Sequence, residues 1–362
     1  MASTNDTVPA EGAAITPAAA MITELKGKTI RIPDLTTMFT TWPKLKVNPF
    51  YKDLKPYVEG KIYEMELDQT KRDDYIKQDL TWFIAVWFPH VDLEMLKVLT
   101  LHVLWLFIWD DRVDIGEGAL ADNLEIANKA RANSAKIWVN LLWGYDDGDW
   151  LDVEVDRVDA VIEPLVEGLG FRGLQAVRFL DSVEEYIRSC EKEQVMRMEG
   201  EVPDYDTYIR MRLDTSAVHT LCALAEYVTG QNLPYEWYER DIIKKIWNAT
   251  NMSVILINDP ISLKKELKTD CIINAVASLH VPGGDVQDAI DQVVKLLDTT
   301  ISDLDRDLEA VRDEYIEAEY GMLIEYADAC KQMVIGTLYF SLRSSRYAVA
   351  VNDEDNSMEI TL

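Results

Sequence analysis

The chain has 362 residues, of which 48% are hydrophobic, and this is enough to bury a large core. Its formal net charge of −28 argues against nucleic acid and anionic membrane surfaces as partners, because both select basic surfaces. An anionic substrate would therefore need local cations or a metal ion. The four cysteines form no C-x-x-C pair, so the sequence indicates neither a zinc site nor a disulfide framework, which fits a reducing, cytoplasmic compartment.

The two ends of the chain differ from the rest in composition. Residues 1–28 have neither a basic start nor a sustained apolar run, which argues against a signal peptide and predicts a disordered tail. Residues 352–362 are interpreted as a polar tail. The apolar runs elsewhere stay below about ten residues, too short to span a bilayer, so no membrane insertion is expected.

Between these tails the hydrophobic pattern is helical. Apolar residues recur at spacings of three and four, which predicts amphipathic helices, and glycine or proline residues fall between the periodic segments. The segments are 93–109, 122–142, 155–169, 173–198, 205–228, 237–257, 286–318 and 320–351. With no alternating strand pattern, repeat or linker, the sequence predicts a single all-α domain over residues 29–351.

Three aspartates follow the apolar segment 101–109. They are Asp110, Asp111 and Asp114, and the first and last share a helical face because they are four residues apart. Burying ionised groups costs several kcal/mol each without a cation or donor, so this position suggests the mouth of a cavity. The alternative is a solvated helix end with Arg112 as a local counter-ion.

A second group of oxygen-bearing side chains lies 148 residues further along the chain. Asn258, Ser262 and Glu266 are spaced by four residues and therefore share one helical face. An amide oxygen, a hydroxyl and a carboxylate suit Mg²⁺, which commonly shares its site with substrate phosphates, and Lys265 is placed to meet such a phosphate. The alternative to a metal site is that these residues cap a helix or lie on its solvent-exposed surface. Pro260 lacks a backbone donor and predicts a disturbance of this helix.

Two such clusters on separate helices can face each other across a cavity and hold metal ions around a diphosphate. In this respect the chain resembles class I terpene synthases over about residues 30–350, and it is most similar to the fungal sesquiterpene synthases. The resemblance implies a helical bundle around a central apolar cavity. It also implies Mg²⁺-dependent ionisation of farnesyl diphosphate, with three ions expected and Mn²⁺ as a substitute, and cyclisation of the carbocation to a hydrocarbon or alcohol.

The resemblance also implies roles for individual residues. The metal ligands would be Asp110, Asp114, Asn258, Ser262 and Glu266. The diphosphate would meet Arg212, Lys265 and the Arg346-Tyr347 pair, since guanidinium groups bind phosphate oxygens in pairs of hydrogen bonds. Thr215 and Ser216 occupy the helix break that couples substrate binding to ionisation in the family.

Aromatic side chains form the last group of candidates. A carbocation needs a dry pocket with aromatic faces, and the resemblance selects Phe83, Phe107 and Phe340 for this task. Plain core packing is an equally open explanation for any one of them. Three further aromatics are interpreted as core packing: Trp87, Trp105 and Tyr339.

Three rival functions remain at this point. A diterpene synthase would use a longer substrate, and a chain-elongating prenyltransferase would use the same chemistry but carries two aspartate-rich motifs, whereas the second motif here is Asn-Asp-x-x-Ser. From a different class, the chain could be an inactive helical protein that binds diphosphate lipids, because fold alone does not give function.

Overall fold

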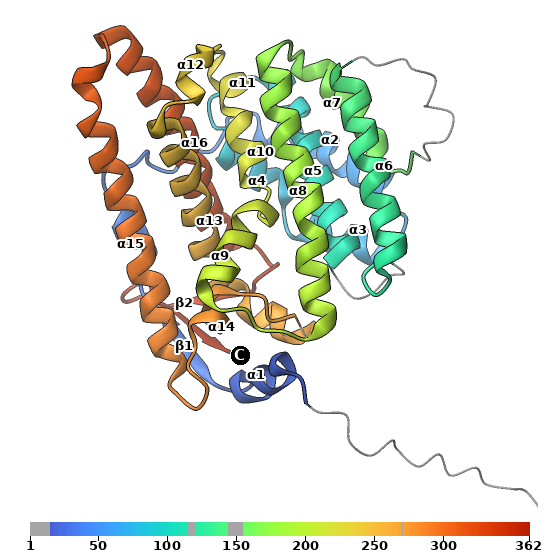
Figure 1. Cartoon of the computed structure of the whole chain (residues 1–362), viewed down its shortest axis with the longest axis vertical. Coiled ribbons are helices and arrows are strands. Elements are labelled where there is room, and N and C mark those ends of the chain that lie inside the picture. The colour runs from blue at the N-terminus through green and yellow to red at the C-terminus, as the bar shows by residue number, and fades with distance from the viewer. Residues whose placement is uncertain (1–14, 115–119, 144–154, 270) are drawn as a thin grey trace, which may run out of the picture.

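The structure is a computed structural model that describes residues 15–114, 120–143, 155–269 and 271–362. It confirms the all-α fold class, because helices make up most of the molecule (Figure 1). The α-helices are α1 Pro17–Leu25, α2 Tyr51–Met65, α3 Gln69–Lys77, α4 Leu80–Trp87, α5 Leu93–Asp114, α6 Leu124–Trp143, α7 Ile162–Leu169, α8 Leu174–Glu199, α9 Tyr205–Thr215, α10 Val218–Ala223, α11 Ala225–Thr229, α12 Tyr235–Tyr238, α13 Asp241–Lys268, α14 Ala275–Leu279, α15 Val286–Ala310 and α16 Glu317–Arg343.

The remaining regular structure is short. The 3₁₀ segments are η1 Leu35–Phe39, η3 Asp159–Val161 and η4 Arg312–Glu314, and the strands are β1 Thr29–Ile32, β2 Ala350–Val351 and β3 Met358–Thr361. The strands form one antiparallel sheet in the order β1-β3-β2. No helix in the described ranges combines the length and apolar character that a membrane crossing requires.

Regular structure is present in the described residues of both predicted tails. In the predicted disordered tail, Thr16 caps α1 and the side chains of Met21 and Leu25 are buried; residues 1–14 lie outside the described residues. In the predicted polar tail, β3 pairs with β1 and buries every second side chain, beginning with Met358. This period of two was present in the sequence, but a four-residue strand is too short to stand out until its partner is known.

Helix boundaries also differ from the predicted segments. The segment 205–228 is divided into α9, α10 and α11. The break between α9 and α10 lies at Ala217, which adopts a left-handed φ of 61° that no α-helix accommodates. Helix α13 continues through Pro260 to Lys268, so the proline does not end it. The helices before residue 93 were not predicted, and among them α4 is buried along its whole length.

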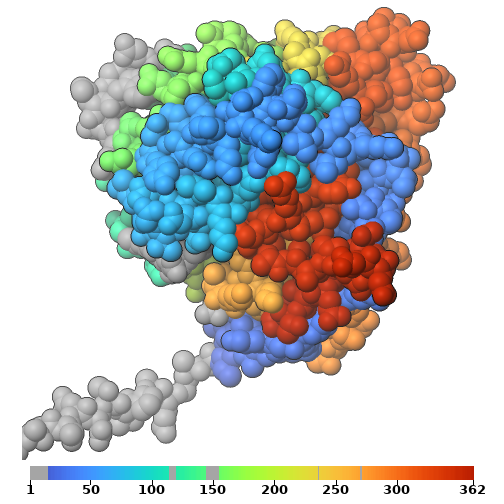
Figure 2. Space-filling model, turned by 180° about the vertical axis from the view of Figure 1, so that it is seen from behind, coloured from blue at the N-terminus to red at the C-terminus, as the bar shows by residue number. Residues whose placement is uncertain are grey.

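Long helices enclose the interior of the molecule. Helix α13 packs against both α15 and α16, and α16 also packs against α4. From behind, the C-terminal segment lies beside the N-terminal third of the chain (Figure 2). Hydrogen bonds fix this junction, since the hydroxyls of Ser344 and Ser345 donate to the carbonyl oxygens of Gln78 and Lys77 at 2.9 and 3.1 Å. The residues after α16 are thereby held at the end of α3.

A buried carboxyl next to α5 makes stability depend on pH. Asp159 is 5% exposed and accepts hydrogen bonds from Nε1 of Trp105 at 3.0 Å and from the hydroxyl of Ser134 at 2.8 Å. Burial raises its pKa from 3.8 to about 6. A pKa that is higher in the folded state gives stability that is complete below pH 3.8 and is lost as the pH rises through 6.

We therefore expect Asp159→Asn to stabilise the protein at neutral pH. The amide keeps an acceptor for Trp105 and removes the buried charge, so the gain at pH 7.5 should be about 2 kcal/mol. Urea denaturation of both proteins at pH 4.5 and 7.5 measures this, and the gain should shrink at the lower pH. An equal difference at both pH values would contradict the assignment of the effect to this carboxyl.

Candidate active site

A cavity of about 230 Å³ lies between α4, α5, α8, the α9–α10 junction, α13 and α16. Its lining contains nearly all the residues predicted for the site: Phe83, Phe107, Asp110, Arg212, Thr215, Ser216, Asn258, Ser262, Lys265, Glu266, Phe340, Arg346 and Tyr347. The exception is Asp114, whose backbone ends α5 but whose side chain lies outside the described residues. Helices far apart in the sequence thus bring the predicted residues to one cavity.

Asp110 and Asp111 have different environments, although they are adjacent on α5. Asp110 accepts a hydrogen bond from the Tyr186 hydroxyl at 3.2 Å, and burial together with the charge of Asp111 raises its pKa to about 6. Asp111 accepts from the Tyr75 hydroxyl at 2.9 Å and from Arg346 at 3.3 Å. Burial opposes ionisation of Asp111, but Arg346 and Lys265 outweigh it and lower the pKa. Asp111 is therefore ion-paired, whereas Asp110 forms no ion pair among the described residues and the charges of Arg212 and Arg346 offset its burial only in part.

The motif on α13 forms a continuous polar edge of the cavity. The Asn258 amide donates to the Tyr347 hydroxyl at 2.8 Å, which leaves its oxygen without a partner among the described residues. One turn on, the Ser262 hydroxyl donates to Glu266 at 2.6 Å. Asn274 donates to the other carboxylate oxygen of Glu266 at 2.8 Å. Burial and the charge of Asp259 raise the pKa of Glu266 to about 7.

Asp259 belongs to the same motif but has a different partner set. It is 2% exposed, and its carboxylate accepts hydrogen bonds from the Tyr208 hydroxyl and, at 2.8 Å, from the backbone N–H of Ala275. It thereby ties α13 to α9 and to the start of α14. Its position about 100° around the helix from Asn258 accounts for this separate role.

Arg212 is a cation of the cavity that has no fixed partner among the described residues. No hydrogen bond holds its guanidinium group within the described part of the chain, although the group lines the cavity. Burial lowers its pKa, but the charges of Glu193, Asp259 and Asp110 raise it well above the usual range. Arg212 therefore remains ionised and is free to pair with an anion.

The helix break next to Arg212 is structurally defined. After α9 ends at Thr215, the Ser216 hydroxyl donates to the Asn251 side chain at 2.7 Å and Ala217 takes its left-handed conformation. The Thr215 hydroxyl is buried in the cavity wall and has no hydrogen-bond partner among the residues that the structure describes. Strained backbone of this kind is common at functional sites, where surrounding contacts maintain it.

Two further cations face the same end of the cavity. Arg346 donates to the Gln78 side chain at 3.1 Å as well as to Asp111, and it lies 5.4 Å from the centre of the Phe107 ring. Burial and the charge of Arg346 lower the pKa of Lys265. With Arg212, these residues supply three positively charged groups beside the polar edge of α13. Such an arrangement can bind a polyanion.

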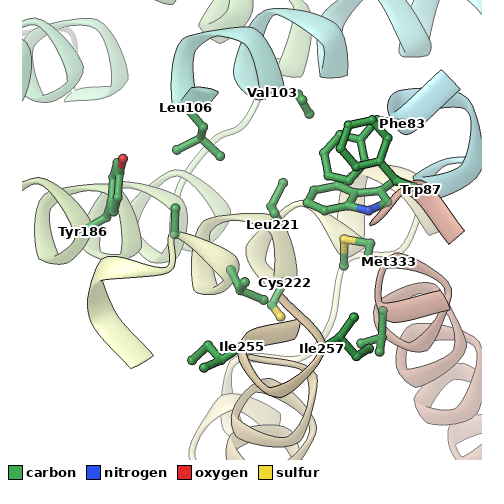
Figure 3. Packing of buried hydrophobic residues seen from close by; sticks show 14 of the residues in the cluster. Phe83, Trp87, Val103, Leu106, Tyr186, Leu221, Cys222, Ile255, Ile257 and Met333 are labelled. Atoms are coloured by element: carbon green, nitrogen blue, oxygen red, sulfur yellow. The ribbon is translucent and has the colours of Figure 1, made fainter. Parts of the chain in front are cut away.

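Aromatic rings form another part of the cavity wall. The Phe83 ring lies 5.3 Å from Phe107 and 4.4 Å from Phe340, measured between centroids. Trp87 lies 4.1 Å from Phe83 and also lines the cavity, so interpreting it as core packing alone is wrong (Figure 3). Trp105 behaves as core packing: it is fully buried and bonds to Asp159.

Several site residues were not predicted from the sequence. Glu193 on α8 lines the cavity and is 8% exposed, and one of its carboxylate oxygens has no partner in the described part of the chain. Its charge contributes most to the raised pKa of Arg212. Asn274 supports Glu266 from the N-cap of α14. A glutamate on the apolar face of the 173–198 helix was the one available signal for Glu193. Nothing local indicated Asn274.

The candidate metal ligands are of mixed type. Within the described residues there is no group of three or more His, Cys, Asp or Glu side chains that could bind a metal ion by themselves. Oxygen donors are instead contributed by the Asn258 amide, the Ser262 hydroxyl and two carboxylates, those of Glu266 and Asp110. Such a donor set suits a hard divalent cation that retains some of its water ligands.

Comparison with known proteins decides the family. The sequence model described as "Terpene synthase family 2, C-terminal metal binding" matches residues 102–303. The chain belongs to the terpene synthase family. It is therefore a terpene synthase, a lyase that uses a divalent metal ion.

Relatives of this terpene synthase resemble it over most of its length. The sesquiterpene cyclase hepA of Aspergillus oryzae is 25% identical over 96% of this chain and 97% of the relative, and the silphinene synthase peniA of Penicillium patulum is 24% identical over 90% and 87%. Among solved structures, the linalool/nerolidol synthase of Streptomyces clavuligerus has a TM-score of 0.70 at 22% identity, covering 83% of this chain and 98% of that one. This structural likeness supports the class I terpene synthase fold.

Proposed function

We propose that this terpene synthase is a sesquiterpene synthase that ionises farnesyl diphosphate with Mg²⁺, releases diphosphate and cyclises the carbocation to a hydrocarbon or alcohol. The observation that supports this most directly is the two-sided cavity. Its polar edge carries three cations and the oxygen donors of α5 and α13, and its other wall carries Phe83, Phe107, Phe340 and Trp87. The similarity to hepA, a sesquiterpene cyclase, supports a fifteen-carbon substrate.

The residues fit a divalent metal. Burial raises the pKa of Asp110 to about 6 and that of Glu266 to about 7, because neither carboxylate has enough compensating positive charge. In our proposal Asn258, Ser262 and Glu266 hold one Mg²⁺, and Asp110 and Asp114 hold the others of an expected three, with Mn²⁺ as a substitute. Bound Mg²⁺ would neutralise charge that develops on the leaving diphosphate.

The protein itself binds and orients the substrate. Arg212, Lys265 and Arg346 pair with diphosphate oxygens, and the Tyr347 hydroxyl adds a donor beside Asn258. Thr215 and Ser216 follow Arg212 at the helix break, so binding of the diphosphate at Arg212 is coupled to the backbone that borders the prenyl chain.

The apolar wall controls the carbocation. Aromatic faces stabilise positive charge and a dry cavity excludes water, which would otherwise end the reaction early. The Phe83 ring lies between 4.4 and 5.3 Å from the rings of Phe340 and Phe107, so the charge would meet a continuous aromatic surface. The Asn/Ser identity of the second motif favours cyclisation over chain elongation.

Product analysis tests this function. Purified protein with Mg²⁺ should convert farnesyl diphosphate to a volatile sesquiterpene, detected by gas chromatography, and EDTA should abolish the product. Ten- and twenty-carbon diphosphates serve as comparisons. Preferential use of the twenty-carbon substrate would indicate a diterpene synthase, and addition of isopentenyl diphosphate to give a longer chain would indicate a prenyltransferase. No product from any of these substrates would contradict the proposal.

A further inference from the structure

Helix α16 approaches the Trp87 side chain so closely that only glycine fits at the contact. A β-carbon at position 336 would lie 2.5 Å from Cδ1 of Trp87 and 3.1 Å from the carbonyl group of Val86. Ordinary contact begins at 3.4 Å, so a methyl group there would displace the indole or α4 by about 1 Å. The indole therefore rests directly on the backbone of α16.

The same helix fixes the orientation of the indole by hydrogen bonds. Nε1 of Trp87 donates to the Thr337 hydroxyl at 3.2 Å, and that hydroxyl donates to the carbonyl oxygen of Met333 at 2.9 Å. The Gln332 amide donates to the carbonyl oxygen of Val86 at 3.0 Å and joins α16 to α4 beside the ring. Trp87 is 6% exposed, so its position is set by these neighbours and by Phe83.

Trp87 is the last cavity-lining member of a row of aromatic rings that begins at the polar edge. The Tyr347 hydroxyl is bonded to Asn258, and its ring lies 6.5 Å from Phe340. From Phe340 the row continues to Phe83 and then to Trp87, with centroid distances of 4.4 and 4.1 Å. Trp87 faces Leu221 and Met333 in the apolar interior (Figure 3). If the diphosphate is bound beside Asn258, Trp87 is thus the ring of this row that lies farthest along the prenyl chain.

We propose that Gly336 and Thr337 are positioning residues that hold Trp87 at the inner end of the cavity and thereby limit the length of the prenyl chain. This inference rests on the proposed function. The absence of a side chain at position 336 keeps the indole against α16 and out of the cavity. The Thr337 hydroxyl keeps the ring from rotating, so that the same contour is presented in every turnover.

Gly336→Ala tests the proposal through the preference for chain length. The displaced indole should shorten the cavity, so kcat/KM for farnesyl diphosphate should fall relative to that for geranyl diphosphate by about tenfold or more. The sesquiterpene mixture should change as well. Gly321→Ala is the matched control, because Gly321 is in the same helix, is exposed and has nothing within 4 Å of an added β-carbon. It should leave the ratio unchanged.

Two more variants distinguish an effect on the position of Trp87 from a loss of folding. Thermal unfolding shows whether each variant is folded. Trp87→Ala added to Gly336→Ala removes the clashing Cδ1 atom with the rest of the indole and should restore use of farnesyl diphosphate. Thr337→Val keeps the side-chain shape but removes the hydroxyl, so it should give a broader product mixture even if Gly336→Ala fails to fold.

This inference would be overturned if Gly336→Ala folds and keeps the wild-type products and the wild-type ratio of kcat/KM for farnesyl and geranyl diphosphate. If Gly336→Ala does not fold, an unchanged product mixture in Thr337→Val would overturn it. An inactive wild-type protein would instead overturn the proposed function, and the inference with it.

Discussion

Replacing Asn258 with alanine is expected to lower turnover of farnesyl diphosphate by about a thousandfold while the protein remains folded. The change removes the amide oxygen offered to the metal and the hydrogen bond of 2.8 Å to Tyr347. Initial rates over a range of Mg²⁺ concentrations measure the effect. The variant should also need more Mg²⁺ to reach half of its remaining rate, because one ligand is missing.

The matched control for this prediction lies in the same helix. Asn248 is exposed and stands ten residues before Asn258 in α13, so Asn248→Ala changes the same residue type in the same helix without touching the cavity. Its rate and its Mg²⁺ dependence should equal those of the wild type. Full turnover in folded Asn258→Ala would refute the assignment of Asn258 as a metal ligand.

Arg212→Lys is expected to reduce kcat by about a hundredfold, although it preserves the charge. Lysine lacks the planar fork that pairs with two phosphate oxygens, and in the wild type no other group within the described residues engages this guanidinium by a hydrogen bond. Steady-state kinetics give the loss, and calorimetry with inorganic pyrophosphate and Mg²⁺ should show weaker binding. The loss in kcat follows from interactions that strengthen as charge develops on the leaving diphosphate.

Arg210 provides the control for Arg212. It is exposed on α9, two residues earlier, so Arg210→Lys tests the effect of the substitution on the helix itself. This variant should keep the wild-type kcat and pyrophosphate affinity. If Arg212→Lys retained both as well, the proposed role of Arg212 in binding the diphosphate would be wrong.

The site could be predicted to different degrees from the sequence. Asn258, Ser262 and Glu266 were found because a spacing of four residues places side chains on one face of any helix, whatever surrounds it. Trp87 was misjudged, because a helix that is buried all round, as α4 is, has no periodicity to show which face borders a cavity. Glu193 and Asn274 were missed because their partners, Arg212 and Glu266, lie on other elements.

The sequence by itself determined the helical class and the two polar motifs, because hydrophobic periodicity and ligand spacing are local properties of a helix. The tertiary structure alone decided three other features. These are the strand pairing of the chain ends, the separate environments of Asp110 and Asp111, and the close contact between Gly336 and Trp87. Each depends on atoms from segments far apart in the chain, whose distance and burial are fixed only when the helices pack.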